Sequence, residues 1–336
     1  MINKSTTQTN KKPYKLTLGP VLFNWKVNEW RDFYFKMAEN PHIDEVYVGE
    51  VVCHKRYPFF EVAFNDVINR LEEAGKVVNI SSFSLILGKQ EINSNKAMLN
   101  AFTENKIELD ESKPRNFGDN AIKNNHNRLV EVNDVGLLGV LKGKDYIVGP
   151  TVNTYNEYTA QTLANQGAKR ICFPYEIDKA SLEFISKALP NTEKEIFAFG
   201  RMPLAIAARC YHARIHGTTK EDCRYVCEKD YNGKPITTTT GEDFLAVNGT
   251  QTMSFSFNNL INELQELMAI GVNVFRISPH FMDMDSVINL FKAVLDGVME
   301  PNEAFIKMQT LLPPRSKFAN GFFYGTAGRD MMKNSE

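Results

Sequence analysis

The sequence predicts an α/β fold in which eight strands alternate with helices, and three observations lead to this prediction. One unit recurs, in which an amphipathic helical stretch ends at a glycine and a β-branched strand follows within about three residues. Eight strand candidates can be read along the chain, and helical patterns fill most gaps between them. They span about 265 residues, close to the typical ~250 of a (β/α)8 barrel. We therefore expect a TIM-barrel-like fold.

The recurring unit is clearest in three places. Glycine suits the left-handed position just past a helix, and a strand that follows so closely is the second half of a βαβ unit. The helical half is supported by apolar residues at helical spacing before the last copy. The copies are Leu71–Gly75 leading into Lys76–Ile80, Leu163–Gly167 into Lys169–Phe173, and Met268–Gly271 into Val272–Ile277.

The strand candidates are Lys15–Leu18, Glu45–Val51, Val77–Phe83, Arg128–Val132, Tyr146–Val152, Arg170–Pro174, Glu195–Gly200 and Val274–Ser278. An open doubly wound sheet is the alternative, but no G-x-G-x-x-G follows any strand, which disfavours its dinucleotide-binding form. The long stretch between strands seven and eight is an insertion that holds cysteines and a hairpin near Phe244–Ser256, with Asn248-Gly249 at its turn. We expect one barrel domain over 14–312, a polar tail over 1–13 and a C-terminal tail over 313–336.

Composition and charge narrow the function classes. Of the 336 residues, 43% are hydrophobic and 24% charged, as in soluble globular proteins, and the formal net charge is −1. With so small a net charge, no strong electrostatic field favours nucleic acid or an anionic membrane as partner. The first residues are polar and lack a secretory signal, and the longest apolar stretch, around Val135–Leu141, is too short to span a bilayer. We expect a cytoplasmic protein without a transmembrane segment.

The five cysteines are too few, and odd in number, for a secreted disulfide framework. Cys53 lies just beyond strand two, whereas Cys210, Cys223 and Cys227 lie beyond strand seven. In a barrel these carboxyl ends share the face on which enzymes place their chemistry, so four thiols from two distant segments could meet there. Cys172 lies mid-strand and is expected to be a buried core residue.

The chemistry of four thiolates leaves the metal open. Cys223 and Cys227 are four apart, which on a helix would put both sulfurs on one side. The spacing C-x12-C-x3-C is not the knuckle of a zinc ribbon. Four thiolates suit tetrahedral zinc or a 4Fe-4S cluster, and the spacing does not choose between them. The remaining interpretation is that the four cysteines are unrelated core residues that bind no metal.

A resemblance to a known family rests on several segments: 46–56, 168–174, 199–204, 245–252 and the Cys210/Cys223/Cys227 spacing. Together these segments resemble the collagenase-like peptidase family, within it the members that act in ubiquinone biosynthesis. The similarity runs from about Tyr14 to about Leu312. It is specific because four cysteines fall in order within matching surroundings.

The resemblance implies a barrel-type fold and a 4Fe-4S cluster ligated by Cys53, Cys210, Cys223 and Cys227. It also implies a heterodimer with a UbiU-like paralogue and a role in O2-independent hydroxylation of the ring of a ubiquinone precursor, free or on a carrier protein. From the resemblance we therefore expect iron-sulfur chemistry, anaerobic function and this partner.

The sequence departs from the peptidases of that family after Glu195–Gly200. Typical members continue into a short segment with Ser and Gly between two cysteines, and here only the second cysteine remains, as Cys210. No nucleophile, base and orienting group can be assigned together, and neighbours such as Cys53 and His54 point to opposite sides of an extended strand end. Catalytic residues stay unknown. A peptidase and a zinc-stabilised, non-catalytic interaction protein remain as alternatives.

Other polar residues fall near the same face: His54, Lys55, Arg56, Arg201, Arg209, Arg214, Arg276 and His280. They could offset the charge of a thiolate-ligated centre or meet an acidic partner or a ring carboxylate, or they could be solvated or salt-bridged side chains. His212 and His216 have metal-binding spacing, but without a further ligand in register we expect surface or packing roles. The aromatic run Phe322–Tyr324 could dock on the domain or a partner, and a partly ordered terminus is the expectation.

Overall fold

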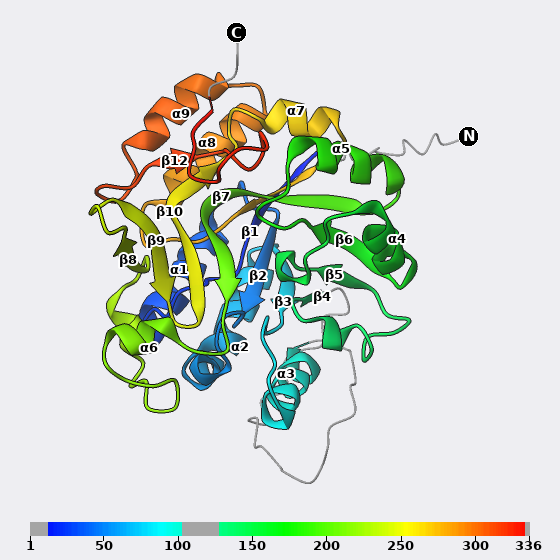
Figure 1. Ribbon diagram of the computed structural model, residues 1–336. Coiled ribbons are helices and arrows are strands. Elements are labelled where there is room, and N and C mark those ends of the chain that lie inside the picture. Colours follow the sequence, from blue (N-terminus) through cyan, green and yellow to red (C-terminus); the bar gives the residue numbers. More distant parts are fainter. Residues whose placement is uncertain (1–12, 103–127, 333–336) are drawn as a thin grey trace.

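The computed structural model describes residues 13–102 and 128–332, and its centre is a closed barrel of eight parallel strands surrounded by helices (Figure 1). The ring closes through β11, which pairs in parallel with β1 at Leu18↔Ile277 and with β7 at Val274↔Glu195. The predicted TIM-barrel-like fold is confirmed, and each strand overlaps its predicted range. The barrel strands are β1 (Lys15–Leu18), β2 (Glu45–Gly49), β3 (Val77–Ser81), β4 (Val130–Val132), β5 (Tyr146–Val148), β6 (Ala168–Cys172), β7 (Glu193–Ile206) and β11 (Val274–Ile277).

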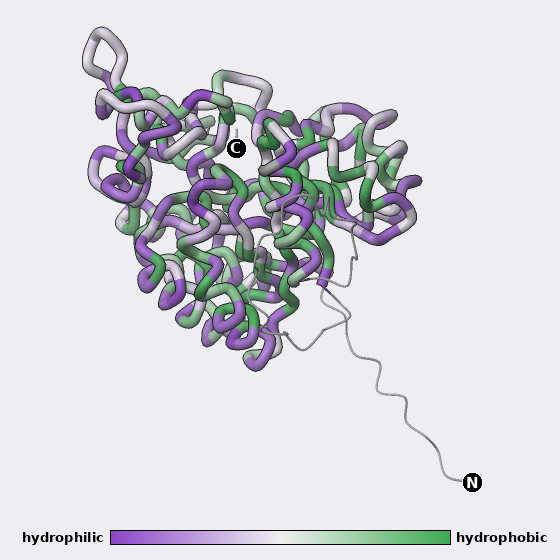
Figure 2. Tube along the Cα trace, turned by 90° about the horizontal axis from the view of Figure 1, so that it is seen from below, coloured by the Kyte–Doolittle hydropathy of each residue, from purple (hydrophilic) through white to green (hydrophobic). Residues whose placement is uncertain are grey.

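Helices pack around the barrel, and local signals set their ends. Asn156, Asp178 and Asp283 each cap a helix by accepting a hydrogen bond from a backbone N–H in the first turn. In Figure 2 hydrophilic and hydrophobic segments alternate around the rim, as amphipathic helices require. The helices are α1 (Val27–Glu39), α2 (Tyr57–Glu73), α3 (Lys89–Phe102), α4 (Glu157–Asn165), α5 (Lys179–Ala188), α6 (Tyr211–Ile215), α7 (Leu264–Ala269), α8 (Met284–Leu295) and α9 (Pro301–Gln309), with short 3-10 turns η1 (His54–Arg56), η2 (Val135–Leu137), η3 (Pro150–Val152) and η4 (Val226–Lys229).

The barrel interior carries charge rather than only aliphatic side chains. Arg276 on β11 places its guanidinium 2.5 Å from Glu131 on β4 and 2.9 Å from Glu195 on β7, and all three side chains are buried. Glu195 also accepts hydrogen bonds from Thr17 and Tyr47. Charged groups this deep are stable only when every one is paired. Arg276 therefore belongs to the barrel core, which corrects its grouping with residues near the thiols.

A second charged layer lies closer to the amino-terminal end of the strands. Arg170 on β6 binds Glu45 on β2 at 2.7 Å and Glu193 on β7 at 2.5 Å, and Lys15 bridges the same two carboxylates. The pKa of Glu45 falls to about 2, because Arg170 outweighs the burial that alone would raise it. The two layers link the strands across the barrel axis.

The insertion between barrel strands seven and eight forms a sheet outside the barrel. Strand β7 continues beyond the ring and pairs antiparallel with β10 (Gln251–Asn259), which pairs with β9 (Asp243–Asn248), and β9 with β8 (Lys234–Thr237). The predicted hairpin is confirmed, because Asn248 and Gln251 close its turn and Gly249 adopts φ 70°. The cysteine-bearing segment with α6 and η4 lies between β7 and β8.

The C-terminal segment packs on the barrel instead of fraying. Strand β12 (Phe318–Ala319) pairs with β10, Phe323 is buried, and the Tyr324 hydroxyl donates to Glu263. The expectation of a partly ordered terminus is wrong for the aromatic run, since Glu263 and the apolar core bind it. The predicted tail over 1–13 lies, except for its last residue, outside the described residues. No described helix is long and apolar enough to cross a bilayer.

Candidate metal centre

The structure places the four predicted ligands in turns and helix starts beyond β2 and β7. Cys53 precedes η1, Cys210 precedes α6, and Cys227 lies in η4. Cys210 is close enough to Cys223 and Cys227 for their charges to affect its pKa, and Tyr225 is affected by the charges of Cys53, Cys223 and Cys227. The fold therefore brings the two segments together at the carboxyl-terminal end of the barrel.

The path between Cys223 and Cys227 is a turn rather than a helix. Arg224 and Tyr225 both have positive φ, 46° and 51°, and η4 starts only at Val226. Two successive left-handed residues break a helical register. The expectation that the sulfurs of Cys223 and Cys227 share one helix face is therefore wrong.

Arg56 is the buried cation of this region. Its side chain donates to Leu22 O at 3.2 Å and to Asn248 Oδ1 at 2.6 Å, while its Nε is buried without a hydrogen-bond partner among the described residues. Burial alone would lower the pKa of Arg56, but the negative charges of Cys227 and Glu50 outweigh it and raise the pKa. The charge of the guanidinium opposes the rise that burial causes in the pKa of Cys53 and of Cys210.

The hairpin turn of the insertion holds Arg56 in place. Gly249 has φ 70°, and a Cβ there would collide with Arg56 Nη2, so a glycine is required on both grounds. The next residue, Thr250, donates its hydroxyl to Val52 O at 2.7 Å, next to Cys53. The turn that the sequence identified as a hairpin signal thus joins the two thiol-bearing segments.

Individual thiols differ in their surroundings. Burial raises the pKa of Cys53 to about 11, although Arg56 opposes this shift. Asn24 Nδ2 donates to Cys227 Sγ at 3.3 Å, and the backbone N–H of Ala213 donates to Cys210 Sγ at 3.4 Å. Such N–H donors stabilise thiolates and the sulfurs of a bound metal centre. Asn24 had no recognisable signal in the sequence.

The distances among the four cysteine sulfurs can be compared with those that a metal ion requires. A tetrahedral zinc ion holds its four thiolate sulfurs about 3.8 Å apart, given Zn–S bonds of about 2.3 Å. Among the described residues, no three of these cysteines have sulfurs within 4.8 Å of one another. By their chemistry, four thiolates suit either a tetrahedral zinc ion or a 4Fe-4S cluster.

The remaining basic residues do not act as one group. Lys55 donates to the carbonyls of Lys220 and Glu221 and so fastens the cysteine loop to η1. His54 Nδ1 lies 3.1 Å from Glu91. Arg209 and Arg214 are exposed on this face, as expected of solvated side chains.

Arg201 and His280 are buried beyond the barrel mouth, where they hold the outer sheet. Arg201 donates to backbone carbonyls of β10 and packs over the rings of Phe255 and Phe257. His280 Nε2 accepts from the Arg201 backbone N–H at 3.2 Å, and burial lowers its pKa to about 3. Both residues have structural partners here.

Cys172 and the histidine pair complete the set of predicted residues. Cys172 is fully buried on β6, which confirms its core assignment. His212 is also fully buried, and His216 stacks on it with ring centroids 5.3 Å apart. The fold adds Asp230, the residue that follows η4, whose Oδ2 lies 3.0 Å from His212 Nε2. The sequence offered no further ligand in register with the two histidines, because only the folded loop brings Asp230 close. The burial of His212 and its stacking on His216 fit the packing role that was expected.

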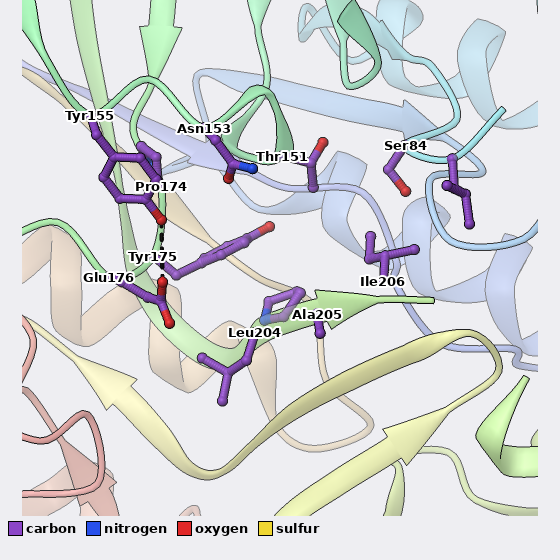
Figure 3. Close-up of a pocket in the computed structure, with 12 residues that line it drawn as sticks. Ser84, Thr151, Asn153, Tyr155, Pro174, Tyr175, Glu176, Leu204, Ala205 and Ile206 are labelled. Atoms are coloured by element: carbon purple, nitrogen blue, oxygen red, sulfur yellow. Dashed lines mark hydrogen bonds between the residues drawn. The ribbon is translucent and has the colours of Figure 1, made fainter. Parts of the chain in front are cut away.

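A cavity of about 290 Å³ opens beside this region at the carboxyl ends of β3, β5, β6 and β7. Ser84 and Thr151 line one part, and Tyr155, which donates to Glu176 at 3.2 Å, lines another (Figure 3). Ser84 also donates to Val51 O, two residues before Cys53. A hydrogen bond therefore joins one residue that lines the cavity to the segment that carries Cys53.

Comparisons with known proteins give three kinds of likeness, to individual relatives, to a solved structure and to a family. The chain is 35% identical over 80 residues to tRNA hydroxylation protein P of Helicobacter pylori strain 26695, and 34% identical over 80 residues to the same protein of strain J99. Each match covers 22% of this chain and 19% of the relative, so the chain matches less than a fifth of their length.

Among solved structures, a soluble mutant of the membrane-associated (S)-mandelate dehydrogenase from Pseudomonas putida is similar with a TM-score of 0.31 and 9% identity. That alignment covers 88% of this chain and 72% of the other. The family comparison reaches much further along the sequence. The model of Peptidase family U32 matches residues 33–333, which include the whole thiol region, and the chain therefore belongs to Peptidase family U32.

Proposed function

We propose that this chain is an iron-sulfur protein that acts, as the ubiquinone biosynthesis protein UbiV does, in O2-independent hydroxylation of the ring of a ubiquinone precursor. In this proposal Cys53, Cys210, Cys223 and Cys227 ligate a 4Fe-4S cluster, and the active unit is a heterodimer with a UbiU-like paralogue. The observation that carries the proposal is the gathering of four thiols from two distant segments around one buried arginine.

Several features of the chain fit such a cluster. Arg56 would offset the negative charge of four thiolates, and its buried Nε lacks an acceptor among the described residues, which a cluster sulfur would supply. Asn24 and the Ala213 N–H already donate to ligand sulfurs. When bound, the cluster would supply one-electron chemistry. The chain's own residues hold the ligands, donate hydrogen bonds and partly exclude water.

A role in hydroxylation is supported by the relatives, which are named for hydroxylation of tRNA. The cavity beside the thiols has room for a small aromatic ring and presents hydroxyl and carboxylate groups from Ser84, Thr151 and Glu176. We assign it as the position of the ring in this subunit. A peptidase is disfavoured because no nucleophile, base and orienting group can be assigned together among the described residues.

The test is a deletion strain grown with and without O2. We expect it to lack ubiquinone only without O2 and to accumulate an under-hydroxylated precursor, and the wild-type gene and Cys172→Ala, but not Cys53→Ala, should restore synthesis. Co-expression with the UbiU-like paralogue should give a stable heterodimer by size-exclusion chromatography. Normal anaerobic ubiquinone would refute the proposal. Loss of hydroxylated tRNA nucleosides instead would assign the chain to the relatives' substrate.

A further inference from the structure

We infer that His212, His216 and Asp230 form a second metal site, separate from the four cysteines, which binds one divalent transition-metal ion of the zinc class. Their three ligand atoms lie within 4.8 Å of one another. Two imidazoles and a carboxylate suit zinc with one position left for water. The inference goes beyond the proposed function and does not depend on it.

The tautomer of His212 leaves its other ring nitrogen free to bind a metal. Its Nδ1 lies 3.2 Å from Val247 O, and because a carbonyl only accepts, Nδ1 carries the proton. In the neutral imidazole, Nε2 then presents a lone pair. Ligating histidines commonly donate their second N–H to a backbone carbonyl in this way, which fixes the ring orientation.

The lone pair of His212 faces a group that cannot satisfy it. Its Nε2 is 3.0 Å from Asp230 Oδ2, and the two make no aligned hydrogen bond. His216 Nε2 is likewise buried without a hydrogen-bond partner among the described residues. Buried acceptors that face each other repel, and a cation between them removes this cost.

The ring geometry allows both histidines to reach one ion. They stand at i and i+4 around α6, and their rings lie parallel with an interplanar angle of 9°. Ligand atoms around a tetrahedral zinc are about 3.3 Å apart, given bonds of about 2.0 Å. The His212–Asp230 pair already meets this spacing at 3.0 Å, and the ligand atom of His216 lies within 4.8 Å of both.

The site would fasten the cysteine loop at both ends. His212 follows Cys210 by two residues, Asp230 follows Cys227 by three, and Val247 belongs to β9. An ion there ties α6 to η4 and to the outer sheet. The loop that carries three of the proposed cluster ligands would thus keep its shape before a cluster enters.

The experiment titrates zinc into the anaerobically purified full chain, whose iron and sulfide are measured first. We expect wild type to retain one more zinc per chain than His216→Gln or Asp230→Asn, with iron and sulfide unchanged in both variants. His42→Gln, which alters a histidine near the amino end of β2, and Asp222→Asn should behave as wild type. Zinc X-ray absorption should show nitrogen and oxygen neighbours.

A second readout uses cluster-free protein, in which zinc should raise the Tm of wild type but not of His216→Gln. Equal zinc in wild type and His216→Gln, or sulfur neighbours for the zinc that distinguishes them, would overturn the inference. Failure of the cluster proposal would appear separately, as missing sulfide with the zinc difference between wild type and His216→Gln retained.

Discussion

The barrel interior and the cysteine centre are both buried and both charged, but they differ in whether their groups are already paired. Inside the barrel, Arg276 binds Glu131 and Glu195, and Glu195 also accepts from Thr17 and Tyr47. At the cysteine centre, Arg56 Nε has no partner among the described residues and burial raises the pKa of Cys53 to about 11. A fully paired network has no donor left for a ligand, whereas the cysteine centre still has one at Arg56 Nε.

The largest effect is expected from removing a proposed ligand. Cys53→Ala, Cys210→Ala, Cys223→Ala or Cys227→Ala should each lose most of the cluster iron, since a methyl group cannot replace a thiolate. Cys172→Ala should keep it, because that thiol is a buried core group. Iron and sulfide analysis after anaerobic purification measures this. Full iron in one of the four variants would remove that cysteine from the ligand set.

Breaking the barrel network should cost stability and leave the cysteine centre chemically intact. Arg276→Ala leaves Glu131 and Glu195 buried without their cation, and we expect a loss of about 3–5 kcal/mol in the free energy of unfolding. Lys169→Ala is the control, because its pair with Asp145 at 3.1 Å is more than half exposed and should be worth about 0–1 kcal/mol. Urea unfolding measures both. Equal losses of unfolding free energy in Arg276→Ala and Lys169→Ala would contradict the difference between a buried and an exposed ion pair.

Arg56 should act on the cluster more than on the fold. We expect Arg56→Gln to retain the cluster roughly tenfold less well, about 1.4 kcal/mol, and Arg56→Lys to recover part of the loss because the charge remains. Arg209→Gln, exposed on the same face, is the matched control. Iron loss to a chelator over time gives the comparison. If Arg56→Gln lost iron no faster than wild type, the buried charge of Arg56 would not support the centre.

A further effect is a pH dependence of stability at Glu263, which binds the C-terminal segment. Burial raises the pKa of Glu263 to about 7, against its hydrogen bonds from Asn320 and Tyr324. A raised carboxyl pKa gives stability that is complete below about pH 4.5 and lost as pH rises through 7. Glu263→Gln should therefore gain about 1–2 kcal/mol relative to wild type between pH 5 and 8. Urea unfolding at both pH values measures this, with the exposed Glu242→Gln as the control. The same change in the free energy of unfolding for both variants would refute the prediction.

The sequence predicted what is periodic and local. Strand and helix patterns, the glycines that follow helices and the Asn248-Gly249 turn each depend on near neighbours, and all gave correct elements. The shared face of the cysteines followed from topology, since carboxyl ends of parallel strands meet at one end of a barrel. Pairings across the barrel were missed, because nothing local links Arg276 to Glu131, 145 residues earlier.

The same reason explains the errors around the cysteines. The turn between Cys223 and Cys227 depends on two left-handed residues that have no sequence signature, and Asp230 reaches His212 only after the loop folds. Alternation of polar residues in the strands, such as Glu45 with Tyr47, was the signal that could have indicated a polar barrel interior.

The central claim is that the four thiols hold an iron-sulfur cluster. The most direct test is iron, zinc and acid-labile sulfide analysis of the full chain purified without O2. We expect a brown protein with iron and sulfide in near-equal amounts, about four of each per chain. Stoichiometric zinc that persists in His216→Gln, together with no sulfide, would contradict it.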